Sequence, residues 1–145
     1  MQVHDIMTRT VELITPDTAI REAARLMRED NIGALPVREN DRLVGMVTDR
    51  DIVVRAVVDG RADSGTVRDI MSEHAFWCYD DVSLDEAAVS MAEHQIHRLP
   101  VLNHDKRLVG IVALADLSCA GKDGPDAAKR ALLGISEATG QGRRA

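Results

Sequence analysis

Two stretches of the sequence, GMVTDRD and GIVALAD, place a carboxylate at the same point after an apolar run. In the first stretch Thr48 stands three residues before Asp51, whereas in the second Ala113 stands three residues before Asp116. A T-x-x-D pattern between a strand and an apolar run is typical of a helix cap. The same hydroxyl and carboxylate are also suited to binding a polar ligand. Both interpretations are open at this point.

The second stretch bears on this choice, because it keeps the aspartate without the threonine. Replacing a capping threonine by alanine typically costs about 1 kcal/mol. A role in capping alone would more naturally lose both residues or keep the hydroxyl. The retained Asp116 therefore fits a separate duty, such as hydrogen bonding to a diol.

A histidine and an arginine, His97 and Arg98, lie between a predicted helix and a predicted strand in IHRLPV. The planar fork of an arginine suits phosphate recognition, and histidine adds charge below its ordinary pKa of about 6.5. The alternative is a solvated loop pair, or a cation near a helix C-terminus. The matching stretch, IGALPV, has Gly33 and Ala34 there, so it cannot supply the same charges.

A zinc site is an alternative use of the histidines. His94 and His97 form an H-x-x-H pattern, and His104 follows nearby. The spacing suits one helix face, but no cysteine accompanies it. We therefore expect no metal.

The sequence contains an internal repeat of one unit. Three blocks recur in the same order: VHDIMT as VRDIMS, IGALPV as IHRLPV, and RLVGMV as RLVGIV. The first two pairs are 64 residues apart and the third is 65 residues apart, so the turn before the third block has gained one residue. Periods of this kind indicate repeated structural units.

Each copy is predicted to fold as β-α-β-β-α, which makes the chain an α/β (α+β) protein. The first strands are predicted at 11–15 and 76–79. The helices that follow carry apolar residues at i, i+3, i+4 and i+7, in the sets Ile20, Ala23, Ala24, Met27 and Leu84, Ala87, Ala88, Met91. A hairpin of two short apolar strands comes next, with Pro36 expected near a strand start or edge. A second helix is expected from about Asp49 to Asp59, stopped by Gly60.

The helix ends carry their own signals. Ser83 and Glu86 are predicted to form a capping box, whereas Ala19 occupies the Ser83 position in the first copy, so Asp17 or Thr18 is expected to cap there. After Gly121 the pattern stops. An extra helix with Pro125 at its first position is predicted, followed by a disordered end, GQGRRA.

Composition narrows the class of protein. The chain has 145 residues, with 45% hydrophobic and 29% charged residues and a net charge of −6. This balance indicates a soluble domain, and the negative charge disfavours nucleic-acid binding. No apolar run or signal peptide points to a membrane, and Cys78 and Cys119 fit no disulfide scaffold. We expect a cytoplasmic protein. No nucleophile motif or Gly-rich phosphate loop is present, so an enzyme is not expected.

The repeated unit, with IGALPV and RLVGMVTDRDIV, resembles the cystathionine-β-synthase (CBS) domain, and two copies resemble a Bateman module. The resemblance covers about residues 1–120. It implies two repeats packed with pseudo-twofold symmetry, with a cleft between them that binds adenosine-containing ligands such as AMP, ADP, ATP, NAD or S-adenosylmethionine. The expected divisions are repeat 1 at 1–62, repeat 2 at 63–121, and a C-terminal helix and tail at 122–145.

The resemblance also implies roles for particular residues. The family pattern G-h-x-[ST]-x-x-D maps onto Gly45, Thr48 and Asp51, where the aspartate bonds ribose hydroxyls and the threonine lies near the phosphate. Arg50, His97 and Arg98 are expected at phosphates. Two strands are expected to frame the adenine, through Ile14, Thr15, Pro16, Ala34, Leu35 and Pro36. With the resemblance added, we favour ligand binding for the Thr48 and Asp51 pair, whereas for Asp116 capping and binding stay equally open.

The aromatic residues set the second copy apart. All three lie in FWCY, as Phe76, Trp77 and Tyr79. They are expected to form a strand buried between the repeats, or alternatively to place a ring at the second adenine pocket, since Tyr79 aligns with Thr15.

These observations predict a regulatory module that binds an adenine nucleotide, requires no cofactor, forms a homodimer and signals to a separate effector protein. The alternative is a constitutive dimeric scaffold whose ligand site has decayed. A third interpretation, a metal-dependent stress protein that uses the histidines, is remote.

Overall fold

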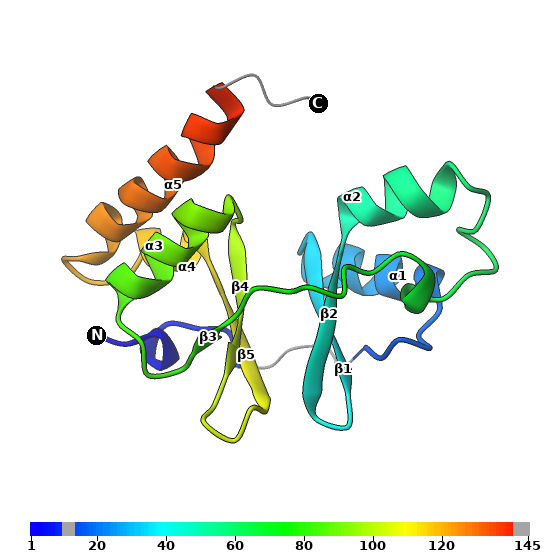
Figure 1. The fold of residues 1–145 in the computed structure, drawn as a ribbon, viewed down its shortest axis with the longest axis horizontal. Coiled ribbons are helices and arrows are strands. Elements are labelled where there is room, and N and C mark those ends of the chain that lie inside the picture. The colour runs from blue at the N-terminus through cyan, green and yellow to red at the C-terminus, as the bar shows by residue number, and fades with distance from the viewer. Residues whose placement is uncertain (10–13, 141–145) are drawn as a thin grey trace. The chain divides into compact units, whose positions relative to one another are not determined.

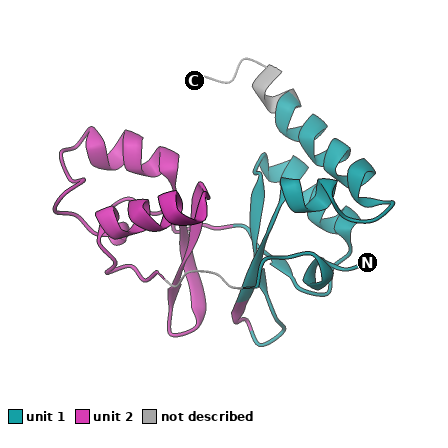
Figure 2. Cartoon of the chain, turned by 180° about the vertical axis from the view of Figure 1, so that it is seen from behind, with its two compact units in different colours: residues 1–10, 76–105, 109–145 teal, residues 11–75, 106–108 magenta. Residues whose placement is uncertain are grey.

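The computed structural model describes residues 1–9 and 14–140, with side chains as far as residue 136. The chain divides into two compact units, coloured separately in Figure 2. Unit 1 contains residues 1–10, 76–105 and 109–145, and unit 2 contains residues 11–75 and 106–108.

Unit 2 is built on the antiparallel hairpin of β1 (Ala34–Glu39) and β2 (Arg42–Thr48), seen in Figure 1. Ile14 adds a parallel bridge to Val37. The other elements of the unit are α1 (Ile20–Asp30), α2 (Asp49–Asp51), the π-helical η2 (Ile52–Val57) and the 3₁₀ turn η3 (Val67–Asp69). The hairpin is confirmed, whereas of the strand predicted at 11–15 residues 11–13 lie outside the described residues.

Unit 1 repeats this plan with a three-stranded sheet in the order β3 (Cys78–Tyr79), β4 (Arg98–Leu102) and β5 (Leu108–Ala113). Its helical elements are η1 (Val3–Asp5), α3 (Leu84–His94), α4 (Leu114–Ser118) and α5 (Gly124–Gly140). Strand β3 runs parallel to β4 and is shorter than the predicted 76–79. The extra helix is confirmed, and it packs on α3 and α4. Pro125 lies in its first turn, and residues 141–145 of the predicted disordered end lie outside the described residues.

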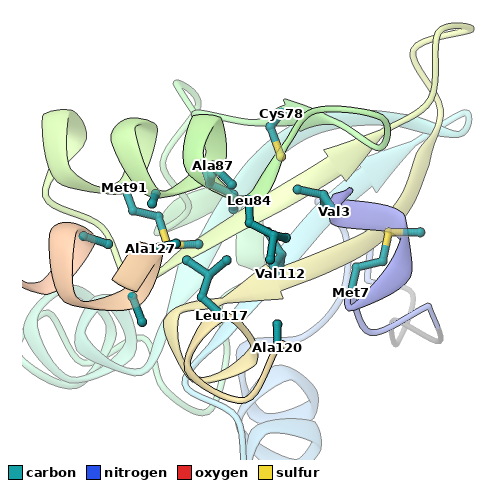
Figure 3. Close-up of a cluster of buried hydrophobic side chains, with 14 of the residues drawn as sticks. Val3, Met7, Cys78, Leu84, Ala87, Met91, Val112, Leu117, Ala120 and Ala127 are labelled. Atoms are coloured by element: carbon teal, nitrogen blue, oxygen red, sulfur yellow. The ribbon is translucent and has the colours of Figure 1, made fainter. Parts of the chain in front are cut away.

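The predicted apolar stripes form the core of each unit. In α3 the buried residues are Leu84, Ala87, Ala88 and Met91, as predicted from their spacing. Figure 3 shows several of them packed with Val3 and Met7 from the N-terminal segment. In α1 the buried residues are Ile20, Ala23, Leu26 and Met27, so Leu26 takes part and Ala24 is only half-buried. No helix in the described part of the chain is long and apolar enough to cross a membrane.

The two units exchange segments with respect to the repeats of the sequence. The N-terminal segment (residues 1–9) packs in unit 1 with the second copy, and the linker segment (residues 63–75) packs in unit 2 with the first. Thr8 pairs with Ile111 of β5 through two backbone hydrogen bonds, of 2.9 and 3.0 Å. Ser72 pairs with Met46 of β2 in the same way, at 2.8 and 3.0 Å. Packing therefore divides the chain differently from the sequence repeats at 1–62, 63–121 and 122–145, whose boundaries stay a prediction.

Two equivalent glycines permit this pairing. A Cβ atom on Gly45 would lie 2.5 Å from the carbonyl oxygen of Ser72, and one on Gly110 would lie 2.7 Å from that of Thr8. Carbon atoms do not approach backbone oxygens so closely, so a side chain at either position would push the paired segment away. Glycine therefore has a packing role in both copies, in addition to any role in the ligand pattern.

Pro36 is the third residue of β1, which is an edge strand of the two-stranded sheet. It stands opposite Met46, whose backbone N–H and carbonyl groups both bond to Ser72. The missing N–H of the proline therefore removes no bond to β2. The predicted position near the start or edge of a strand is confirmed, together with its physical reason, the missing donor.

The helix caps differ from the prediction in one copy. The Oγ atom of Ser83 accepts a hydrogen bond from the Glu86 N–H at 3.1 Å, which confirms that half of the capping box. Neither Asp17 nor Thr18 caps α1, because the N-cap is Ala19, without a side-chain bond. The carbonyl of Gly65 in the linker segment accepts the N–H of Ile20 at 3.2 Å instead. The linker segment therefore supplies a partner for an N–H group at the start of α1 that has none within the helix.

The predicted helix from Asp49 to Asp59 is present as α2 followed by η2, and it ends before Gly60, which has φ +70°. The N–H of Arg61 donates to the carbonyl of Ala56 at 2.8 Å, which closes the last turn. In η2 only Ala56 is fully buried, and Val53, Val54 and Val57, together with Val58 directly after the helix, are 48–75% exposed. This segment consequently presents an apolar face to solvent, which we call the valine face.

Candidate ligand-binding motifs of the two repeats

The junction between β2 and α2 carries a complete, reciprocal cap. The backbone N–H of Asp51 donates to Thr48 Oγ1 at 3.1 Å, and that of Thr48 donates to Asp51 Oδ2 at 2.9 Å. The second carboxylate oxygen, Oδ1, lies 3.9 Å from Nε of Arg55, which also donates to the carbonyl of Ile70 at 3.1 Å. The Asp51 side chain is 17% exposed. The motif is therefore held in one geometry before any ligand arrives.

The junction between β5 and α4 keeps half of this cap. The backbone N–H of Ala113 donates to Asp116 Oδ2 at 2.8 Å, although Ala113 has no hydroxyl to return the bond. The retained aspartate is thus explained by a structural role that survives the loss of the threonine. An aspartate at this position accepts the N–H of the N-cap residue even without the hydroxyl. The bond gives Asp116 a structural role, and its ligand role stays a prediction.

The same bond recurs at the other short helices of the chain. Asp5 Oδ2 accepts the N–H of Gln2 at 2.8 Å, and Asp69 Oδ2 accepts that of Thr66 at 3.0 Å. This bond is the main reason that the pKa of Asp5 is lowered, because it stabilises the charged carboxylate. Four aspartates, two in each sequence repeat, therefore accept a hydrogen bond from the backbone N–H three residues earlier in the chain.

Unit 2 brings together the three segments that the resemblance assigns to one pocket. Ala34 pairs directly with Thr48, and the carbonyl of Gly33 accepts the N–H of Asp49 at 2.9 Å. The carbonyl of Ile14 accepts the N–H of Arg38 at 2.9 Å, so the segment before α1 lies along β1. The side chains of Ile14, Pro16, Ala34, Leu35 and Pro36 are buried, and those of Thr15 and Arg50 are exposed.

Asp49 also belongs to this region, although the sequence motifs did not indicate it. The carboxylate of Asp49 lies against Gly33, where an added Cβ would be 3.0 Å from Oδ2. The second copy has His97 and Leu114 at the matching positions. The sequence signal that could have indicated Asp49 is that both positions differ between the two copies. Their relationship can be recognised only when the pairing of the strands is known.

Unit 1 contains the two cationic candidates. The carbonyl of His97 accepts the N–H of Leu114 at 2.8 Å, so His97 and Arg98 lie beside the junction that carries Asp116. The His97 side chain is exposed and that of Arg98 is half-buried. The structure therefore groups His97 and Arg98 with Asp116 in unit 1, and groups Thr48, Arg50 and Asp51 in unit 2.

The side chains of His94 and His104, which belong to the zinc alternative, contact other groups. Ring Nδ1 of His94 lies 2.9 Å from the carbonyl of Ser90, and the ring stacks on Phe76 with centroids 3.6 Å apart. His104 stacks on Tyr79 at 4.3 Å and its Nε2 lies 2.8 Å from Asp81 Oδ2. The side chains of His94 and His104, two histidines of the zinc alternative, therefore engage different partners.

The aromatic stretch is only partly a buried strand. Cys78 is buried, whereas Phe76 is 46% exposed. Tyr79 receives the edge of Trp77 at 4.9 Å and the face of His104. The ring of Tyr79 thus occupies the place that Thr15 has in the first copy, and the two copies differ there.

The sequence profile of the CBS domain family matches residues 3–57 and 67–122. The chain therefore belongs to the CBS-domain family and carries two such domains in tandem, which confirms the resemblance and the α+β fold.

Relatives share nearly the full length of the chain. It is 42% identical to the CBS domain-containing protein YhcV of Bacillus subtilis over 134 residues, which cover 92% of this chain and 94% of YhcV. The CBS domain pair of MJ0100, solved in complex with 5′-methylthioadenosine and S-adenosyl-L-methionine, superposes with a TM-score of 0.73 at 29% identity, covering 81% and 93% of the two chains. Hypoxic Response Protein I, solved with two coordinated zinc ions, gives 0.71 at 37% identity, covering 81% and 97%.

Proposed function

We propose that this protein is a non-catalytic regulatory module that binds an adenosine-containing ligand between its CBS repeats. The observation that carries the proposal is the gathering of three segments in unit 2, where Ala34 pairs with Thr48 and the segment of Ile14 lies along β1. These segments are the ones that the CBS resemblance assigns to the adenine, the ribose and the phosphate. The adenosine ligands of the MJ0100 pair support the ligand class.

The two sites differ in this proposal. The main site uses Thr48, Arg50 and Asp51 of the first copy, with His97 and Arg98 of the second copy contributing charge toward phosphates, as the family arrangement implies. The second site, around Asp116, has neither a threonine hydroxyl nor an equivalent of Asp49. Ligand binding signals by favouring one arrangement of the repeats, and the signal passes to a separate effector protein in the cytoplasm.

Calorimetry with AMP, ATP, NAD and S-adenosylmethionine tests the proposal. Because Asp51 also caps α2, the variant is Asp51→Asn and its control is Asp69→Asn, which alters the same kind of cap away from the motif. We expect saturable binding of at least one ligand, weakened about tenfold or more by Asp51→Asn and unchanged by Asp69→Asn. Absence of heat with all four ligands at millimolar concentration supports the scaffold alternative instead. Equal loss in both variants assigns the effect to folding and sinks the ligand role.

We also propose a homodimer that uses the valine face of η2. Val53, Val54, Val57 and Val58 expose 48–75% of their surface within one short segment, and contiguous apolar patches of this kind are typical of association sites. Sedimentation analysis is expected to give a dimer for the natural chain and a monomer for Val54→Asp. Leu133→Asp, on the exposed side of α5, is the control and should stay dimeric. A monomeric natural chain, or a dimeric Val54→Asp variant, contradicts the assignment.

A further inference from the structure

Two carboxylates and an imidazole converge in unit 1, away from both capping motifs. Asp80 and Asp81 directly follow β3, and His104 lies in the turn between β4 and β5. One ligand atom from each of the three side chains lies within 4.8 Å of the others. The closest pair is His104 Nε2 and Asp81 Oδ2, at 2.8 Å. All three side chains reach the surface, so an ion has access to them.

The sheet holds these residues in place. The backbone N–H of Asp80 donates to the carbonyl of Leu102 at 2.9 Å, and the carbonyl of Asp80 accepts the N–H of His4 at 2.9 Å. The His104 ring lies flat on Tyr79, with an interplanar angle of 16°. The nitrogen that faces Asp81 is therefore presented by a ring whose orientation is set by residues outside the cluster.

The corresponding junction of unit 2 provides an internal comparison. There Pro16 and Asp17 follow Ile14, which forms a parallel bridge to Val37, and the carbonyl of Pro16 accepts the N–H of Arg68 at 2.9 Å, as Asp80 does with His4. Nη2 of Arg68 lies 3.3 Å from Asp17 Oδ1. Unit 2 thus pairs one carboxylate with a permanent cation, which cannot bind a metal.

Unit 1 differs from unit 2 at three points of this junction. A second carboxylate, Asp80, replaces Pro16; a histidine, His4, replaces Arg68; and the turn that is one residue longer supplies His104. Each change removes a group that cannot ligate a metal or adds one that can. The ring nitrogens of His4 are occupied, since Nε2 lies 2.6 Å from Gln2 Oε1 and Nδ1 lies 3.2 Å from Asp5 Oδ1, so His4 is not counted as a ligand.

We propose that Asp80, Asp81 and His104 form a binding site for a divalent transition-metal ion of the zinc class. Two carboxylate oxygens and one imidazole nitrogen are a common ligand set for such ions, whereas Ca²⁺ and Mg²⁺ prefer oxygen ligands alone. Water completes the coordination, because the three residues lie at an exposed edge. The ion takes the place of the hydrogen bond between His104 and Asp81, and it bridges the end of β3 to the β4–β5 turn. This proposal is independent of nucleotide binding.

Titration of the full chain with ZnCl₂, followed by calorimetry, tests the site, and Co²⁺ absorption spectra identify the ligand type. The variants are His104→Ala and Asp81→Asn. Their controls are His74→Ala, which removes another exposed histidine, and Asp17→Asn, at the position of unit 2 that matches Asp81. We expect one ion per chain, bound about tenfold or more weakly in both variants and as tightly as in the natural chain in both controls.

Two outcomes overturn the proposal. If the natural chain gives neither heat with Zn²⁺ nor a Co²⁺ spectrum, then Asp81 and His104 form only a hydrogen-bonded ion pair. If an ion binds but its affinity is unchanged in His104→Ala and Asp81→Asn, other groups hold it. Circular dichroism of each variant checks that a loss of binding occurs in a folded chain.

Discussion

The Oδ2 atom of Asp116 lies 2.8 Å from the backbone nitrogen of Ala113, and this bond caps α4 without help from a hydroxyl. In the first copy Asp51 makes the same bond to Thr48, which returns one of its own. The two copies therefore share one capping device in a full and a reduced form. An aspartate common to both is not by itself a sign of two ligand sites.

Restoring the hydroxyl should stabilise the second copy. Ala113→Thr gives α4 the side-chain acceptor that Thr48 gives α2, so we expect a gain in the free energy of unfolding of about 1 kcal/mol. Thr48→Ala should lose a similar amount. Urea denaturation followed by circular dichroism measures both. Ala115→Thr, an exposed position of the same helix that offers no cap, should instead lose a few tenths of a kcal/mol. If the free energy of unfolding of Ala113→Thr did not exceed that of Ala115→Thr, the result would count against the cap.

Gly110→Ala should detach the N-terminal segment from β5. The added carbon would lie 2.7 Å from the carbonyl oxygen of Thr8, and we expect a loss of about 1–3 kcal/mol from such overpacking. Hydrogen exchange should accelerate at the amides of Thr8 and Ile111, which bond to each other's carbonyls. In the matched variant, Gly45→Ala, the acceleration should move to Met46 and Ser72. Identical exchange patterns in the two variants would be inconsistent with separate docking of the two segments.

The carboxyl of Asp81 should titrate below its ordinary value of 3.8, because the hydrogen bond from His104 stabilises the charged form. A carboxyl with a lowered pKa stabilises the fold above its unfolded-state pKa, and that contribution is lost as the pH falls through the folded-state pKa. Carbon NMR titration should show the pKa of Asp81 rising toward 3.8 in His104→Ala. The pKa of Asp5, which depends mainly on the N–H of Gln2, should stay low in that variant. An unchanged Asp81 pKa would show that the bond to His104 is absent in solution.

The two cysteines should differ in reactivity. Burial raises the pKa of Cys78 to about 12, so its thiolate is scarce at neutral pH, whereas Cys119 is exposed. A thiol reagent at pH 8 should therefore modify one cysteine of the native chain, and mass spectrometry should locate it at Cys119. Both should react in denaturant. Rapid labelling of Cys78 in the native chain would mean that unit 1 opens readily.

Repetition made the fold predictable, because matched blocks fixed the order of elements and the apolar stripes fixed the buried faces of α1 and α3. The capping roles of Ser83 and Thr48 followed from local sequence for the same reason. Local sequence does not say which copy a segment packs against, so the exchange of the N-terminal and linker segments, and the capping of α1 by Gly65, were not predictable. His104 was considered only together with His94 and His97, and Asp80 and Asp81 were not considered, because a helix and a strand separate the two aspartates from His104 in the sequence.

The exchanged segments have a consequence for attempts to study one repeat alone. A peptide that ends at residue 62 carries an N-terminal stretch whose pairing partner, Ile111, is missing, and it lacks Val67 and Ile70 from its own core. The complementary peptide lacks Val3 and Met7. Neither half is self-sufficient, yet together they contain every contact, so the two peptides should fold on mixing as a complementation pair. The peptide bond after residue 62 is then not required for folding, whereas the exchange of the N-terminal and linker segments is required.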